Sequence, residues 1–310
     1  MARHHQVSDD DITQALKAFG IRADSWKHIS SGDVNTSYVI MLEGGLLYTL
    51  SFLNRKVRNP DQLYDILTYT AAERIPVPTP IPTRKGETFL TQGDNRIMLK
   101  SFIQGRCDRI LPAEEMREAG SMLARIHELR PIEALEPVSF RGLEPAQLDE
   151  IAALTTADYS EWLRTSISTT DYMEDSDLPR GFAHGDFWSD NLVVTDTGLA
   201  VLDWDNAALD ILVFDIAFAL AGLLQDSSGI LDRQRLDDFL NGYQSVRKLT
   251  DAEKETLPDA LLRASALISG HRFYRHHILF PDPALHDPVK YGRYEETIYI
   301  GEAGRSLSFI

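Results

Sequence analysis

Residues 182–204 read FAHGDFWSDNLVVTDTGLAVLDW and are the most informative segment of the chain. It opens with His-Gly-Asp, ending at Asp186, and Asn191 follows five residues later. The sequence then predicts a tight hairpin that leads to Asp203, with its strands at residues 192–195 and 199–202. One loop and one hairpin are therefore expected to deliver three oxygen-bearing side chains to the same place.

Those three side chains match the needs of phosphoryl transfer from ATP to a hydroxyl. A carboxylate must orient the acceptor hydroxyl and take its proton, and hard oxygen ligands must hold Mg²⁺ against the phosphates. The spacing Asp-x-x-x-x-Asn followed by a later Asp is that of the protein-kinase catalytic loop and its magnesium-binding aspartate. The stretch therefore predicts a phosphotransferase that uses ATP and Mg²⁺.

The N-terminal part of the chain is predicted to be rich in β-structure. Residues 9–20 predict a short helix, with acidic residues in the first turn and Gly20 as its stop. Segments rich in β-branched and aromatic residues predict strands at 37–42, 46–53, 88–91 and 96–102. Pro60 begins a predicted helix at 60–74, and the proline-punctuated residues 75–82 should run extended.

After Gly105 the pattern becomes mainly helical. Apolar residues recur there at helical spacing, at Met116, Ala119, Leu123 and Ile126. The longest apolar run, residues 207–224, carries Asp210 and Asp215, whose charges would be costly inside a bilayer. We expect this run to be a buried helix. The fold class is thus α+β, with a β-rich lobe at residues 1–104 and a larger, mostly helical lobe at 105–310.

Composition and net charge limit the cellular compartment and the classes of binding partner that we expect. The chain has 310 residues, a formal net charge of −16 and one cysteine, Cys107. A single cysteine permits no internal disulfide, and the polar N-terminus lacks the apolar stretch of a signal peptide, so we expect a cytoplasmic protein. The acidic surface should repel nucleic acid and anionic membranes. It would suit a cationic or zwitterionic small molecule, or simply serve solubility.

The segments HGDFWSDN and VLDWDNAALDILVFDIA resemble the catalytic segment of the aminoglycoside phosphotransferase and choline kinase superfamily. In that superfamily HGD-x-x-x-x-N precedes a hydrophobic-Asp-Trp segment and then Asp-Leu-Ala, which here is residues 215–217. The resemblance extends over nearly the whole chain to the homoserine-kinase-like subgroup, through SSGDVNTSYVI, LLYTLSFLNRK, RIPVPTPIPTRKGE, MLKSFIQGR, LARIHEL and LNGYQSVRKLTDAEKETLP.

The resemblance implies a bilobal, protein-kinase-like fold and a role for each matching residue. Asp186 would be the catalytic base, and Asn191 and Asp203 would hold Mg²⁺. The nucleotide would be bound by a phosphate-covering loop at 30–36 and by a hinge whose backbone meets adenine, with Ser31, Gly32, Asn35 and Thr36 in the loop and Ser101 and Ile103 in the hinge.

Two departures from the family pattern concern the nucleotide and the acceptor. The kinase pattern places a lysine in the third strand, and the matching residues 49–51 have none. Homoserine-kinase-like members often lack it too, and Arg55 or Lys56 could replace it only if the chain bends. The homoserine kinase loop usually reads HADLFPDN, so Gly185, Trp188 and Ser189 depart from it.

Three residues are expected near the acceptor hydroxyl. Trp188 lies beside the base in sequence and could stack on a sugar ring. Arg272 could pair with the carboxylate of an amino-acid substrate. Asp205 could assist Mg²⁺ or the substrate, or it could cap a helix that begins near residue 207, which is the interpretation we favour from the sequence.

The sequence leaves the acceptor open. Homoserine or a similar amino alcohol is favoured by the resemblance over the whole chain. An aminoglycoside, nucleoside or other sugar-containing antibiotic is favoured by the superfamily, the acidic surface and Trp188. A function of another class, a nucleotide-binding pseudokinase, has the missing strand lysine as its only support. The choice between ATP and GTP and the oligomeric state are not predicted.

Overall fold

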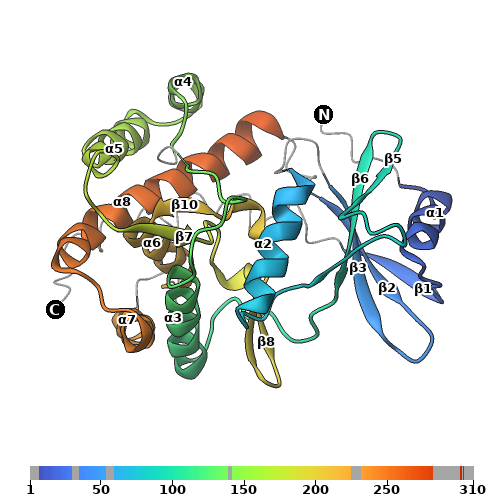
Figure 1. Ribbon diagram of the computed structural model, residues 1–310. Helices are drawn as coiled ribbons and strands as arrows, with labels where there is room; N and C mark the ends of the chain where they lie inside the picture. Colours follow the sequence, from blue (N-terminus) through green and yellow to red (C-terminus); the bar gives the residue numbers. More distant parts are fainter. Residues whose placement is uncertain are drawn as a thin grey trace. The chain divides into compact units, whose positions relative to one another are not determined.

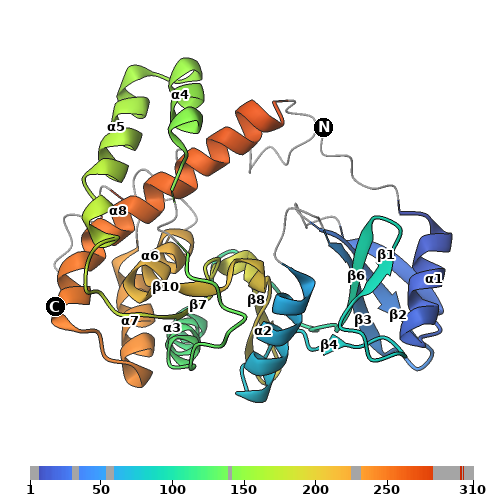
Figure 2. The ribbon, with the colours of Figure 1, turned by 45° about the horizontal axis from the view of Figure 1, so that its top comes forward.

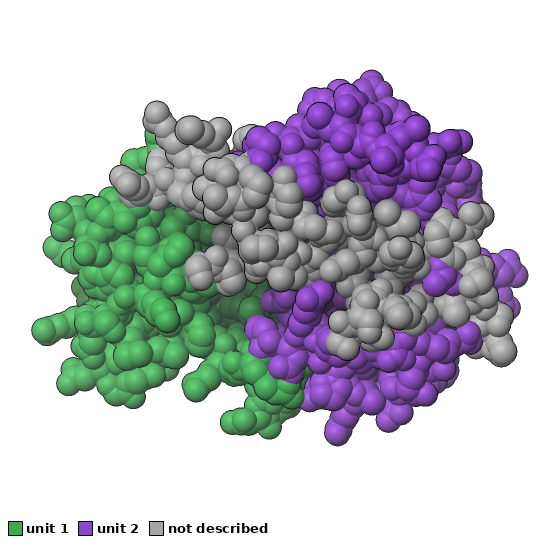
Figure 3. All heavy atoms as spheres, turned by 180° about the vertical axis from the view of Figure 1, so that it is seen from behind, with its two compact units in different colours: residues 1–106, 132–135, 193–206 green, residues 107–131, 136–192, 207–310 purple. Residues whose placement is uncertain are grey.

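The computed structural model describes residues 7–29, 35–53, 59–138, 142–224 and 232–281, together with residues 301 and 303. The chain forms two compact units, coloured separately in Figure 3. The first unit is residues 1–106 with 132–135 and 193–206, and the second is residues 107–131, 136–192 and 207–310. The segment that carries Asp203 thus belongs to the first unit, although it follows the Asp186 loop in sequence.

The first unit is built on an antiparallel sheet with strand order β1-β2-β3-β6-β4, and β5 also pairs with β6 (Figure 1). The strands are β1 (Ser25–Ile29), β2 (Thr36–Met41), β3 (Leu47–Leu53), β4 (Pro80–Ile81), β5 (Leu90–Gln92) and β6 (Asn95–Ser101). Gly44 and Gly45, which join β2 to β3, have φ of 86° and 83°. Only glycine adopts these angles readily, so the expected hairpin turn forms there.

Two helices accompany this sheet. In α1 (Asp9–Phe19), Ser8 and Asp11 form a reciprocal capping box at the start, and Gly20 ends the helix in the left-handed conformation. Its buried residues pack on the sheet in one cluster, with Ile12, Leu16 and Phe19 against Ile40, Leu50, Phe52, Ile97 and Leu99. The helix α2 (Pro60–Ala72) starts with proline at its first turn and contacts β4 and the turn η3 (Trp204–Asn206).

The second unit is mostly helical (Figure 2). Its helices are α3 (Ala113–His127), α4 (Pro145–Leu154), α5 (Ala157–Ser168), α6 (Leu212–Leu223), α7 (Arg233–Val246) and α8 (Asp251–Phe273), which continues into a π-helical turn, η4 (Tyr274–Leu279). Short elements complete the chain, namely η1 (Asp171–Met173), β7 (Arg180–Ala183), η2 (Ser189–Asn191), β8 (Leu192–Thr195), β9 (Gly198–Val201) and β10 (Ala208–Ile211). The α+β fold class predicted from the sequence is confirmed.

We had expected the apolar run at 207–224 to form a single helix, and this expectation is wrong. Residues 208–211 form β10, which pairs antiparallel with β7, and α6 begins only at Leu212. A short apolar segment suits a buried strand and a buried helix equally well, so its periodicity cannot separate them. Asp205 therefore does not cap the helix, because the capping position is Ile211. No helix among the described residues is both long enough and apolar enough to cross a bilayer.

The helices α3 and α7 touch through their backbones. A Cβ atom on Gly242 of α7 would lie 1.9 Å from the Arg117 carbonyl oxygen of α3, and one on Gly120 would lie 2.0 Å from the Phe239 carbonyl oxygen of α7. Because both contacting atoms belong to the backbone, neither contact can be relieved by rotating a side chain. This crossing fixes the position of Tyr243, the residue after Gly242.

We predict that Gly242→Ala destabilises the protein by at least about 2 kcal/mol, because the added methyl group must push two helices apart. Denaturant unfolding of the variant would measure the loss. The control is Asn241→Ala, at the exposed neighbouring position on α7, which should change the free energy of unfolding little. Equal stability of the two variants would contradict the helix contact.

Candidate active site

The loop after β7 is held by the buried carboxylate of Asp215. Its Oδ2 accepts the backbone N–H of His184 at 2.8 Å, and its Oδ1 accepts that of Gly185 at 2.7 Å. Gly185 has a φ of 80°, which a residue with a side chain would adopt only with strain. These two hydrogen bonds hold the two residues immediately before Asp186. Asp215 therefore determines the direction of the chain at Asp186, where it leaves β7.

Asp186 and Asn191 meet, as the sequence predicts. The Asn191 side-chain amide donates to the Asp186 carbonyl oxygen at 2.8 Å and to Asp186 Oδ2 at 2.9 Å. Both amide hydrogens of Asn191 are thereby used on Asp186, which leaves its Oδ1 as the side-chain atom for a metal ion. His184 is fully buried, and its Nδ1 accepts the Asp186 N–H at 3.2 Å. This histidine orients the backbone of the loop.

A chain of buried hydrogen bonds supports Asp215 from behind. His127 Nε2 lies 3.0 Å from Asp215 Oδ2, and His127 Nδ1 lies 2.7 Å from the Tyr243 hydroxyl. Arg247 Nη1 donates to the Tyr243 hydroxyl oxygen at 3.0 Å and lies 2.9 Å from Glu253 Oε1. The chain therefore runs from α8 through α7 and α3 to the catalytic loop.

The hydrogen bonds from Arg247 to Asp215 all run in the same direction from donor to acceptor. Burial raises the pKa of the Tyr243 phenol, so it stays protonated and donates to His127 Nδ1. The ring hydrogen of His127 then lies on Nε2 and faces the Asp215 carboxylate. A charge pair at one end thus fixes the histidine tautomer that Asp215 requires at the other.

Trp188 and Arg272 also come together within the second unit. The Arg272 guanidinium carbon lies 5.1 Å from the centroid of the Trp188 ring, within range of a cation–π contact. Trp188 packs against Gly222 of α6, where a Cβ atom would lie 2.7 Å from the Trp188 Cβ. An aromatic face and a cation therefore lie two residues beyond Asp186, where the sequence places the acceptor.

The first unit holds the other predicted ligands. Asp203 has a φ of 55°, an uncommon angle for a residue other than glycine. Strain of this kind persists where the surrounding structure enforces it, and it concentrates at functional sites. The Asn35 side-chain amide donates to Asp205 Oδ2 at 3.4 Å, just before Thr36 begins β2. Asp205 therefore lies beside Asn35, and its expected part at the acceptor or at Mg²⁺ stays a prediction.

Two of the three backbone N–H groups in the predicted hinge are hydrogen-bonded within the protein. The Ser101 N–H donates to the Thr79 carbonyl oxygen and the Phe102 N–H to that of Leu47. Within the described residues this leaves the N–H of Ile103 as the unengaged amide of the hinge. Ser31 and Gly32 lie outside the described residues, as do Arg55 and Lys56.

Lys100 occupies a position that sequence reasoning passed over. It pairs directly with Thr49 across β3 and β6, so its side chain shares the face of Thr49 and Ser51. Those are the positions where the kinase pattern places its lysine. The register between β3 and β6 is the signal that identifies Lys100, and a single sequence does not reveal that register.

The predicted Mg²⁺ ligands fit that ion by their chemistry. Asn191 and Asp203 offer an amide oxygen and a carboxylate, and Mg²⁺ in kinases usually takes one or two such groups together with phosphate oxygens and water. In the described ranges, no three His, Cys, Asp or Glu side chains converge as metal ligands.

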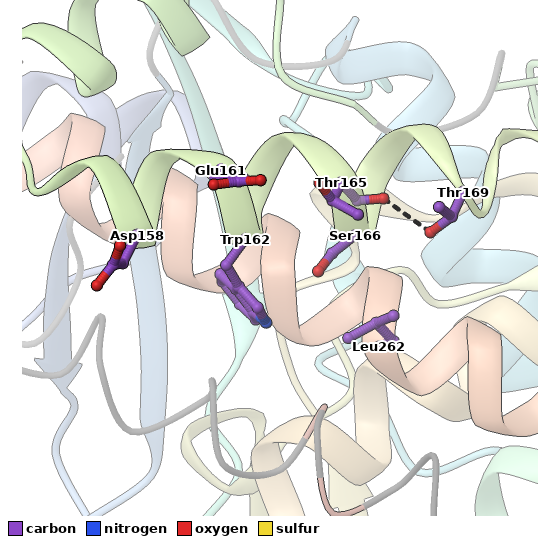
Figure 4. Close-up of a pocket in the computed structure, with 7 residues that line it drawn as sticks. All are labelled: Asp158, Glu161, Trp162, Thr165, Ser166, Thr169 and Leu262. Atoms are coloured by element: carbon purple, nitrogen blue, oxygen red, sulfur yellow. Dashed lines mark hydrogen bonds between the residues drawn. The ribbon is translucent and has the colours of Figure 1, made fainter.

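Two surface cavities lie apart from these residues. One of about 320 Å³ lies between α5 and α8, and Figure 4 shows Asp158, Trp162 and Ser166 from α5 facing it with Leu262 from α8. The other, of about 430 Å³, lies at the end of α1. No predicted site residue lines either cavity.

Comparison with known proteins agrees with the motifs. Residues 25–249 match the model of a family described as the phosphotransferase enzyme family. A homoserine kinase of Rhizobium meliloti is 28% identical over 280 residues, covering 86% of this chain and 84% of that protein. A homoserine kinase of Granulibacter bethesdensis is 29% identical over 279 residues, covering 86% of each.

Solved structures share the fold. A spectinomycin phosphotransferase in complex with ADP and spectinomycin has a TM-score of 0.75 at 14% identity, covering 97% of this chain and 100% of that one. A microcompartment-associated aminopropanol kinase has a TM-score of 0.72 at 19% identity, covering 97% and 96%. The chain belongs to the phosphotransferase enzyme family, as a kinase that transfers a phosphoryl group to a hydroxyl of a small molecule.

Proposed function

We propose that this kinase phosphorylates the hydroxyl of L-homoserine or a closely similar amino alcohol, with ATP as donor. The observation that carries the proposal is the pairing of Arg272 with Trp188 two residues beyond Asp186. A guanidinium there can bind an amino-acid carboxylate through two parallel hydrogen bonds. The similarity to homoserine kinases over 86% of the chain supports the same acceptor.

The proposed chemistry assigns one task to each group. The Asp186 carboxylate accepts the proton of the substrate hydroxyl while that oxygen bonds to the γ-phosphorus. The bond from the γ-phosphorus to the bridging oxygen breaks, ADP carries away the electron pair, and the proton later leaves Asp186 to solvent. When bound by Asn191 and Asp203, Mg²⁺ would supply positive charge to the phosphate oxygens. Asp205 would act on this nucleotide side, through Asn35.

A sugar-containing antibiotic is the second candidate acceptor. The Trp188 ring could stack on a sugar, and a net charge of −16 suits a polycationic substrate. The structural relatives that act on antibiotics resemble this chain in fold alone, at 14–16% identity. The second candidate therefore rests on Trp188 and the net charge.

We predict that Asp186→Asn lowers kcat by at least about 100-fold while ATP still binds, because the proton acceptor is lost and the shape is kept. A coupled ADP-release assay would measure turnover, and calorimetry would measure ATP binding. Asp196→Asn, in the exposed hairpin turn between β8 and β9, should keep full activity. If Asp186→Asn keeps most of its activity, Asp186 is not the base.

Asn191→Ala should raise the Mg²⁺ concentration needed for half-maximal activity. The variant loses Oδ1 as a ligand and also frees the Asp186 carboxylate from its amide partner. A Mg²⁺ titration of activity at saturating ATP measures the shift, with Asn241→Ala as the matched control. An unchanged Mg²⁺ requirement would remove Asn191 from the metal site.

The acceptor itself is tested by ADP release with L-homoserine, choline, spectinomycin and a linear aminopropanol, which is homoserine without its carboxylate. We expect turnover of homoserine, and we expect Arg272→Gln to raise KM for homoserine about tenfold or more, since a hydrogen bond to a charged group contributes about 1.5–3 kcal/mol. The aminopropanol should be affected little by the substitution. Arg233→Gln, exposed on α7, is the charge-matched control.

Preferred turnover of spectinomycin would overturn the homoserine proposal in favour of the antibiotic. Turnover of homoserine with an unchanged KM in Arg272→Gln would keep the substrate and reject Arg272 as the group that binds its carboxylate.

A further inference from the structure

A cavity of about 430 Å³ lies in the first unit beside the C-terminal end of α1. Its walls come from α1, from the segment between α1 and β1, and from the turn after β4. Pockets that bind small molecules in proteins usually measure roughly 300–1,000 Å³. None of the residues assigned above to the nucleotide or the acceptor lines it.

Three cations line this cavity in a chain whose net charge is −16. They are Lys17 in the last turn of α1, Arg22 just beyond it, and Arg84 in the turn after β4. Within the described ranges, none of these side chains forms an ion pair, although carboxylates are common there. Like charges gathered without partners raise the local potential, which favours a bound anion.

Arg84 is held in place before any ligand arrives. Its backbone N–H donates to the Ala18 carbonyl oxygen at 2.9 Å, which ties the turn to the end of α1. The turn is closed from within by Thr83, whose hydroxyl oxygen accepts the N–H groups of Lys85 and Glu87. The Arg84 side chain lies against Gly20, where a Cβ atom would lie 2.4 Å from its Nε. A cation placed in advance costs less to order on binding.

A helix C-terminus usually repels an anion through its unpaired carbonyl oxygens, but at the end of α1 several of these oxygens are hydrogen-bonded. The Ile21 N–H bonds to the Leu16 carbonyl oxygen at 2.9 Å and the Gly20 N–H to that of Lys17 at 3.1 Å, which is the Schellman arrangement. With the Ala18 carbonyl taken by Arg84, these three terminal carbonyl groups are satisfied. The carbonyl oxygens of Leu16, Lys17 and Ala18 are therefore already engaged at the helix end beside the three cations.

The rest of the lining is apolar. Leu16 and Ile21 line the cavity, as does Trp26, which is half-buried. The Trp26 indole N–H donates to Asp9 Oδ1 at 2.9 Å, which favours this orientation of the ring. An aromatic ring beside apolar side chains offers a surface for the apolar body of a ligand.

We propose that this cavity is a second ligand site of the kinase, and that it binds a small organic anion, with a carboxylate or phosphate group on an apolar or aromatic body. The anionic group pairs with Arg84, Lys17 and Arg22. The body lies on Leu16, Ile21 and Trp26. The site is separate from phosphoryl transfer and does not depend on which acceptor the enzyme uses.

The test uses calorimetry on the full chain with saturating ADP present, so that the nucleotide site is filled. The probes are phenyl phosphate, phenylacetate and the neutral benzyl alcohol. The variant is Arg84→Gln. Its matched control is Lys27→Gln, which removes the same charge one residue after Trp26 in β1, where successive side chains point to opposite faces.

We expect saturable binding of at least one anionic probe, none of benzyl alcohol, and weaker binding as salt is raised. Arg84→Gln should weaken binding about tenfold, or 1.4 kcal/mol, and Lys27→Gln less than twofold. The indole N–H resonance of Trp26 should shift on titration with the anionic probe. No saturable binding at millimolar probe, or equal losses in the two variants, would overturn the proposal.

Discussion

One buried carboxylate holds the loop after β7 in its conformation. Asp215 accepts the N–H groups of His184 and Gly185 and lies against His127. A buried charge is costly unless its hydrogen bonds are complete, and here the required partners are the backbone of the loop itself. If the loop left its position, the buried Asp215 carboxylate would lose these hydrogen bonds and nothing would replace them. That constraint is what holds Asp186 and Asn191 in register with each other.

The support for Asp215 lies far from it in sequence. Tyr243 donates to His127, and Arg247, paired with Glu253, donates to Tyr243. Tyr243 and His127 each bond a partner on both sides, so the hydrogen bonds form one continuous chain to Asp215. Three helices thus contribute to a loop that none of them contains. Trp188 and Arg272, to which we assign the acceptor in our proposal, lie on the same helices, because Trp188 packs on α6 and Arg272 extends from α8.

The sequence predicted the elements better than it predicted their partners. The helix at 9–20, the hairpin at residues 43–45 and the Asp186–Asn191 loop follow from local patterns of capping, glycine and spacing, and they formed as expected. Local patterns failed where tertiary pairing decided. Residues 208–211 became a strand because β7 lies beside them, and Asp205 joined Asn35 instead of capping a helix. Tyr243 and Lys100 carry no motif, and only helix packing and strand register bring them to attention.

The crossing of α3 and α7 has a consequence for the chemistry. At that point the helices meet backbone to backbone at Gly120 and Gly242, and the next residue, Tyr243, begins the bonds that lead to Asp215. The position of Tyr243, and so of the bonds to Asp215, thus depends on a contact between backbones. A change that parts these helices would move Tyr243 and, with it, the hydrogen bonds that lead to Asp215.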